Sequence, residues 1–155
     1  MIFVLFSSCI QYEALVVEVI DGDTMKVYID EKVEFVRILG IDCPEIKLEK
    51  NRPEKFENIS AENLTYWAFV AKNFTKNLVE GKRIKFSYDH FSDKRDQYNR
   101  ILAYVYVDGV DVGSEIIKNG LARVYVEAEF LKMREYLKLQ DEAKKRKAGL
   151  WSELK

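Results

Sequence analysis

Three β-type segments follow one another near the start of the chain, before any helical pattern appears. Residues 12–20 have strand character, apolar and polar residues alternate over 25–30, and the pattern continues over 34–39. One helical face comes next and ends at Gly81; its apolar residues are Trp67, Val70, Ala71, Phe74 and Leu78. An order of three strands and then a helix argues against repeated strand–helix crossovers, and so against a parallel sheet.

Two more strands and two more helices complete the predicted pattern. Residues 84–88 alternate, and 101–107 form an apolar run rich in β-branched residues and tyrosine. A short helix is predicted over 112–119, closed by Gly120, and a longer one is marked by Phe130, Met133, Tyr136, Leu137 and Ala143. We therefore predict a mainly β fold with helices: a small closed antiparallel barrel of five strands that carries three helices.

The composition fits one folded domain and leaves few kinds of active site. With 155 residues, 48% of them hydrophobic and 33% charged, the chain is neither disordered nor membrane-embedded by composition. We place an apolar N-terminal segment at 1–11 and one domain at 12–155. The chain has one histidine and two cysteines, which are too few to favour a histidine-centred triad, a zinc site or a disulfide framework.

The apolar segment leaves location open. Three interpretations compete: a signal that starts further upstream, a short lipoprotein signal with a lipid anchor at Cys9, or a first barrel strand that extends into solvent. Sequons at Asn58, Asn63 and Asn73 would accept glycans in an exported chain. We expect an extracytoplasmic protein, secreted or membrane-anchored, with a cytoplasmic location as the alternative.

Carboxylates and arginines recur at positions where a barrel can gather them. The residues are Asp21, Asp23, Asp42 and Glu45, with Arg37 and Arg100. Carboxylate oxygens bind hard divalent cations such as Ca²⁺, and arginine offers a rigid fork of N–H donors to phosphate. The set therefore suits phosphodiester cleavage.

Each of these residues also has a purely structural interpretation. Asp21 and Asp23 flank a glycine and suit a β-turn, which in isolation is the better explanation. Arg37 suits a structural ion pair with Glu45 or Asp42, and Arg100 suits an exposed charge at the start of a strand. A turn explains one acidic pair, however, and not a second acidic motif together with two arginines.

Five short motifs support one family. They lie at residues 19–24, 37–45, 96–104, 120–122 and 149–151, in this order. With them, the stretch from about Glu13 to Trp151 resembles the staphylococcal-nuclease-like (thermonuclease) family. The resemblance implies an OB-fold barrel with three helices and Ca²⁺-dependent cleavage of nucleic acid.

The resemblance also implies roles for single residues. It makes Asp23 and Asp42 direct ligands of Ca²⁺, the Cys43 carbonyl a further ligand, and Asp21 a ligand through water. Glu45 corresponds to the general base, Arg37 and Arg100 to the phosphate clamp, and Tyr98 and Tyr125 to residues that contact the nucleotide.

Some features depart from the family pattern. Gln97 and Asn99 replace a lysine and a glycine beside Tyr98, and only Tyr125 remains where two tyrosines are usual. The stretch 46–66 is longer than its counterpart and is expected to be a solvated loop, with a lid or a glycan-bearing insertion as alternatives.

We expect a monomeric nuclease that acts on DNA, RNA or both with low sequence selectivity. The alternatives are a non-catalytic barrel that binds nucleic acid or protein, and a surface-anchored interaction module. The intact acidic set favours the enzyme.

Overall fold

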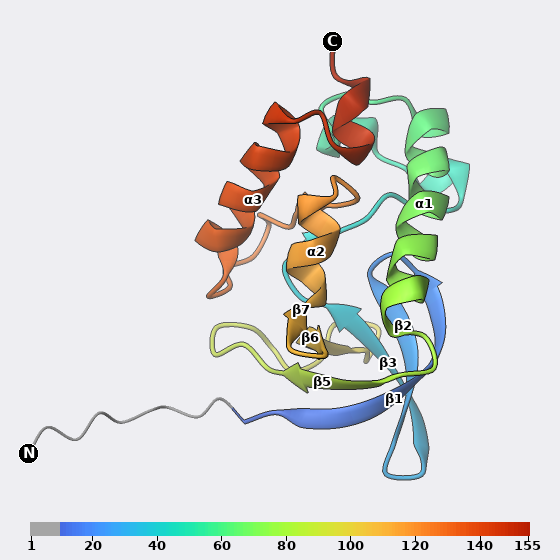
Figure 1. The fold of residues 1–155 in the computed structure, drawn as a ribbon, viewed down its shortest axis with the longest axis vertical. Helices are drawn as coiled ribbons and strands as arrows, with labels where there is room; N and C mark the ends of the chain where they lie inside the picture. Colours follow the sequence, from blue (N-terminus) through green and yellow to red (C-terminus); the bar gives the residue numbers. More distant parts are fainter. Residues whose placement is uncertain (1–9) are drawn as a thin grey trace, which may run out of the picture.

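The computed structural model describes residues 10–155 (Figure 1). Cys9 and the apolar run before it lie outside the described residues, so the signal and the lipid anchor stay predictions. The described strands form a barrel, and the helices gather on one side of it.

Five strands close the barrel. They are β1 (Tyr12–Asp21), β2 (Thr24–Ile29), β3 (Lys32–Ile38), β5 (Arg83–Ser87) and β6 (Ile101–Val107). Their order is β3-β2-β1-β5-β6, and a further pairing of β3 with β6 closes the ring. The predicted five-stranded OB-fold barrel with three helices is confirmed. The prediction of a wholly antiparallel barrel is wrong, because β3 and β6 pair in parallel.

Three very short strands were not predicted. They are β4 (Ile41–Asp42), β7 (Val110–Asp111) and β8 (Arg123–Val124). Two residues carry no detectable alternation, so such strands are invisible to a pattern search. The pairing of β4 with β8 matters most, because it places Asp42 opposite Arg123.

The longest helix packs small residues against the barrel. Helix α1 (Ala61–Val79) begins before the predicted apolar face, where the Ser60 hydroxyl accepts a hydrogen bond from the Asn63 N–H. Its fully buried residues are Leu64, Ala68, Ala71, Thr75 and Val79, whereas Trp67, Val70, Phe74 and Leu78 are only partly buried. The centre of the contact is thus shifted from the predicted stripe toward smaller side chains, which let α1 approach the strands closely.

The other helices cover the same side of the barrel. They are α2 (Val112–Lys118) and α3 (Met133–Lys145), with 3₁₀ turns η1 (Leu48–Lys50), η2 (Pro53–Lys55) and η3 (Gly149–Glu153). Phe130 precedes α3 rather than starting it.

The segment 46–66 packs against the body of the domain through a few buried residues, although most of its residues are exposed as expected for a solvated loop. Phe56 and Ile59 are buried in a second apolar cluster beside the C-terminal turn η3 (Figure 1); its other buried members are Leu64, Ala143, Leu150 and Trp151. An ion pair between Glu57 and Lys144 lies beside this cluster. Apolar burial therefore fixes the segment to the body of the domain.

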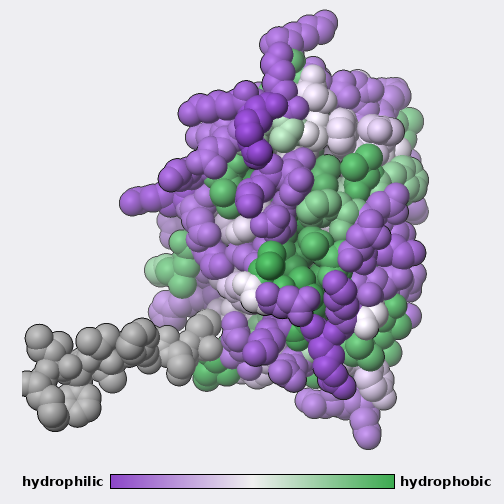
Figure 2. Space-filling view, in the orientation of Figure 1, coloured by the Kyte–Doolittle hydropathy of each residue, from purple (hydrophilic) through white to green (hydrophobic). Residues whose placement is uncertain are grey.

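The surface is mostly hydrophilic on the face that Figure 2 shows, with an apolar area near its centre. Within residues 10–155, no helix has the length and apolar character that a bilayer crossing requires.

We predict that Phe56→Ala lowers the free energy of unfolding by about 3 kcal/mol, because it leaves a cavity in the second cluster. Urea unfolding followed by Trp fluorescence measures the change. Phe91→Ala is the matched control, since Phe91 is 63% exposed whereas Phe56 is 3% exposed. Equal effects of the two substitutions would contradict the packed segment.

Candidate functional site

The acidic turn, residues 21–24, joins β1 to β2 and rests on α1. Asp21 pairs with Thr24 across the turn, and its Oδ1 accepts the Asp23 N–H at 3.2 Å. A Cβ added to Gly22 would lie 2.7 Å from the Cys43 Sγ, so only glycine fits. The buried Thr75 hydroxyl donates to the Gly22 carbonyl at 2.7 Å. The turn expected from sequence is therefore present, and α1 fixes its position.

Asp23 is a buried carboxylate at the tip of this turn. Its side chain accepts hydrogen bonds from the Cys43 N–H at 2.7 Å and from the Thr24 hydroxyl at 3.1 Å. Burial raises the pKa of Asp23 to about 7, against the attraction of Arg37, and the charge of Asp21 raises it further.

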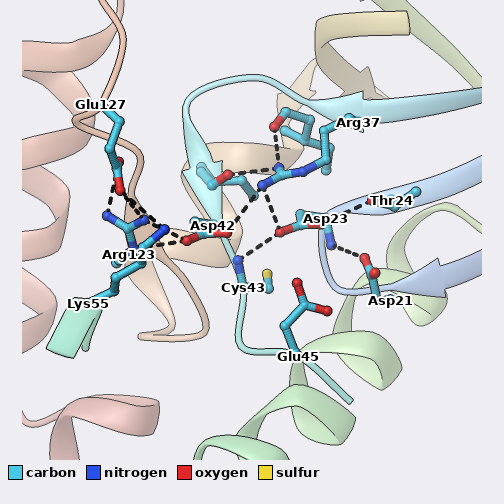
Figure 3. Close-up of polar contacts among 12 residues, drawn as sticks. Asp21, Asp23, Thr24, Arg37, Asp42, Cys43, Glu45, Lys55, Arg123 and Glu127 are labelled. Carbon is cyan, nitrogen blue, oxygen red and sulfur yellow. Dashed lines mark hydrogen bonds and ion pairs between the residues drawn. The ribbon is translucent and has the colours of Figure 1, made fainter. Parts of the chain in front are cut away.

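Arg37 joins the acidic residues to one another (Figure 3). Its Nη1 donates to the carbonyls of Ile38 at 2.9 Å and Ile41 at 2.8 Å. Its Nη2 lies 3.3 Å from Asp23 Oδ2 and 3.4 Å from Asp42 Oδ1. The structural interpretation of Arg37 is thus correct for Asp42, but its second partner is Asp23 and not Glu45.

Asp42 is also held from its other side by Arg123, which the sequence analysis did not single out. Asp42 Oδ2 accepts a hydrogen bond from Nε of Arg123 at 2.9 Å and lies 2.7 Å from Nη2 of the same side chain. The same guanidinium binds both carboxylate oxygens of Glu127, at 2.6 and 3.2 Å (Figure 3). Position 123 directly follows the motif at 120–122, which was the one available signal.

Glu45 lies at the exposed edge of this acidic group. Its backbone N–H donates to the Asn51 side chain at 2.9 Å, and its carbonyl accepts from the same side chain at 2.8 Å. Partial burial raises the pKa of Glu45, and the charges of Asp23 and Asp42 raise it further.

A pocket of about 200 Å³ opens beside Arg37, and Arg100, Tyr98 and Tyr125 line it as well. Arg100 donates through Nε to Asp96 Oδ2 at 2.7 Å, and its Cζ lies 5.4 Å from the centre of the Tyr98 ring. The side chain of Tyr98 is otherwise exposed. The structure thus brings both predicted arginines and both predicted tyrosines to one pocket, with Arg37 as the link to the carboxylates.

The donor set fits a hard cation in its chemistry. Burial raises the pKa values of Asp23, Asp42 and Glu45, and the charges of neighbouring carboxylates raise them further, so a bound cation would stabilise the ionised forms. Within residues 10–155, however, no three His, Cys, Asp or Glu side chains converge closely enough to hold a metal ion. Asp23 and Asp42 instead turn toward arginine and backbone N–H groups (Figure 3). The ligand roles of Asp21, Asp23, Asp42 and the Cys43 carbonyl stay predictions.

Comparison with known proteins decides the family. The family model described as "Staphylococcal nuclease homologue" matches residues 35–153, which is most of the chain. The chain belongs to the staphylococcal nuclease homologue family. The resemblance inferred from the five motifs is confirmed.

Three relatives illustrate the range of this nuclease homologue family. The uncharacterised protein MJ1439 of Methanocaldococcus jannaschii is 32% identical over 151 residues, which cover 91% of this chain and 72% of that protein. Two Bacillus subtilis proteins, the SPbeta prophage-derived endonuclease YokF and the endonuclease YncB, are each 38% identical over 136 residues and 86% of this chain. The match covers 42% of YokF and 58% of YncB, so this chain spans about half the length of the Bacillus relatives.

We predict that, without divalent cations, the free energy of unfolding falls as the pH rises from about 4 to about 7. The pKa of Asp23 is higher in the folded protein than its ordinary 3.8, so the folded protein binds more protons in this range and loses stability as they leave. The loss reaches about 4 kcal/mol at most. Urea unfolding in EDTA at a series of pH values measures it.

Asp23→Asn is the control, because it removes the titrating group at nearly the same volume. The slope between pH 4 and 7 should flatten in this variant, and Ca²⁺ should stabilise the unmodified protein at neutral pH. Identical slopes in both proteins would show that Asp23 is not the origin.

Proposed function

We propose that this staphylococcal nuclease homologue is a Ca²⁺-dependent nuclease that hydrolyses phosphodiester bonds of DNA with low sequence selectivity, with RNA as a candidate second substrate. The observation that carries the proposal is Arg37, which links a surplus of carboxylates to a pocket lined by a second arginine and two tyrosines. Family membership and the endonuclease names of YokF and YncB support it.

The arginines supply phosphate contacts. Among the described residues, Nε of Arg37 and Nη2 of Arg100 have no hydrogen-bond partner, and both residues line the pocket. Guanidinium groups held in place this way stabilise the negative charge that builds on the phosphorus oxygens during attack. Both arginines therefore favour the transition state over the bound substrate.

The carboxylates hold the cation and handle the proton. Asp23, Asp42 and the Cys43 carbonyl would bind Ca²⁺ directly and Asp21 through a water, and the ion would supply charge neutralisation at phosphate and a more acidic coordinated water. Glu45, with its raised pKa, accepts the proton as the water oxygen forms its bond to phosphorus. The bond from phosphorus to one ester oxygen breaks, and that oxygen takes up a proton from solvent.

Low selectivity follows from the kind of contacts that the pocket offers. Tyr98 and Tyr125 provide ring faces, on which any base can stack, while the arginines contact only the backbone.

We predict that the purified protein degrades single-stranded DNA with Ca²⁺ and not with EDTA, and that Asp23→Ala and Asp42→Ala abolish this cleavage. Gel analysis of parallel digests with Ca²⁺, Mg²⁺ and EDTA measures both effects. DNA binding without cleavage by the unmodified protein would favour the non-catalytic module, and full activity of both variants would remove the metal assignment.

We predict that Arg100→Ala lowers kcat by about 10²–10³ and changes KM much less, because the lost contact acts mainly on the transition state. Steady-state kinetics on an oligonucleotide measures both parameters. Arg134→Ala, which alters an exposed arginine of α3, is the control and should leave both unchanged. An effect of Arg100→Ala on KM alone would count against the role.

A further inference from the structure

The packed segment 46–66 contains a buried amide that contacts the backbone of Glu45. Asn51 is 5% exposed, although asparagine is seldom buried without a role in hydrogen bonding. Its Oδ1 accepts the Glu45 N–H at 2.9 Å, and its Nδ2 donates to the Glu45 carbonyl at 2.8 Å and to the Thr65 hydroxyl at 3.0 Å. The Asn51 side chain is thus hydrogen-bonded to both the N–H and the carbonyl of Glu45.

Glu45 needs such a contact because the sheet does not reach it. Strand β4 ends at Asp42, the Cys43 N–H donates to Asp23, and Pro44 has no N–H. The Asn51 side chain therefore makes the two backbone hydrogen bonds that a neighbouring strand would make with Glu45, and these bonds limit the rotation of the Glu45 backbone.

Asn51 is itself held from two sides. Its backbone N–H, directly after η1, donates to the carbonyl of Leu48, the first residue of that turn. The Thr65 hydroxyl, which accepts from Asn51, donates its own proton to the Ala61 carbonyl at 2.9 Å in the first turn of α1. Three hydrogen bonds therefore connect the Ala61 carbonyl of α1, through Thr65 and Asn51, to the backbone of Glu45.

We propose that Asn51 is a positioning residue that sets the Glu45 carboxylate for its proton transfer, and that Thr65 supports Asn51 from helix α1. The inference rests on the proposed nuclease function. It also assigns a task to the segment 46–66, which carries Asn51 to this place.

The expected effect is on turnover. Asn51→Ala should lower kcat by about tenfold to a hundredfold, since a small misplacement of a reacting group is costly. KM and the Ca²⁺ affinity measured by calorimetry should stay within about twofold, because Glu45 is not among the proposed ligands. Asn63→Ala, in which an exposed asparagine of the same region is truncated, is the control.

Two comparisons separate positioning from a general structural role. In a Glu45→Ala background, Asn51→Ala should cause no further loss of kcat, because its action passes through Glu45. Thr65→Val, which removes the hydroxyl at constant shape, should lower kcat in the same sense as Asn51→Ala, whereas Thr65→Ser, which keeps the hydroxyl, should restore it. Thr65→Val also serves if Asn51→Ala folds poorly.

Amide hydrogen exchange supplies a readout without catalysis. The Glu45 N–H should be protected in the unmodified protein and lose protection in Asn51→Ala, while the Cys43 N–H keeps its protection through Asp23. If the unmodified protein cleaves DNA and Asn51→Ala is equally active, or if its loss adds fully to that of Glu45→Ala, the inference is wrong. An inactive unmodified protein with Ca²⁺ present instead contradicts the proposed nuclease.

Discussion

The half of the site that contains the carboxylates depends on the guanidinium of Arg37, whose side chain is 14% exposed. Arg37 is anchored by two backbone carbonyls through Nη1 and places Nη2 between Asp23 and Asp42. It therefore joins the turn after β1, the end of β3 and the start of β4. Removing one partner of a buried ion pair typically costs about 3–5 kcal/mol, because the charge that remains is uncompensated. Burial raises the pKa of Asp23 to about 7 even with Arg37 beside it, so loss of the arginine would disfavour the ionised carboxylate further.

Sequence reasoning found the parts of the site whose signal is local. The acidic turn, Arg37 and the Asp42–Glu45 stretch each lie in a short motif next to a strand, so type and spacing were enough. Arg123 and Thr75 were missed because they reach Asp42 and Gly22 across 81 and 53 residues of chain, and the one sequence signal was the place of Arg123 directly after the motif at 120–122. Asn51 was missed as well, because its burial and its contacts with the Glu45 backbone are visible only in the structure and no motif marks its position. The roles assigned to the site residues stay predictions; what the structure shows is that Arg37 contacts Asp23 and Asp42 and shares a pocket with Arg100, Tyr98 and Tyr125.

The errors in the predicted fold have physical causes. The closing pair β3–β6 is parallel because the other four pairings of the five-stranded ring are antiparallel, so its first and last strands, β3 and β6, run in the same direction. The predicted face of α1 does pack against the core, but the centre of the contact was misjudged because periodicity registers hydrophobicity and ignores size. Ala71 and Thr75 lie fully buried where α1 comes close to the acidic turn, and the larger Trp67 and Phe74 are only partly buried. That close approach allows the Thr75 hydroxyl to bind the Gly22 carbonyl of the acidic turn, so the packing of α1 also fixes the position of the site.

The three arginines of the site differ in how many of their donors are already in use. All the N–H groups of Arg123 are directed to Asp42, Glu127 and the Val124 carbonyl, which leaves it a positioning role. Arg37 keeps Nε for a ligand, and Arg100 keeps Nη2 after its bonds to Asp96 and Thr24, within the described residues. An incoming phosphate can therefore accept hydrogen bonds from Arg37 and Arg100 without breaking the bonds that anchor them. A phosphate bound to Arg123 would instead break the contacts between Arg123 and Asp42. The distribution of existing hydrogen bonds thus separates Arg37 and Arg100, which are proposed to bind substrate, from Arg123, whose donors are directed to residues of the site itself.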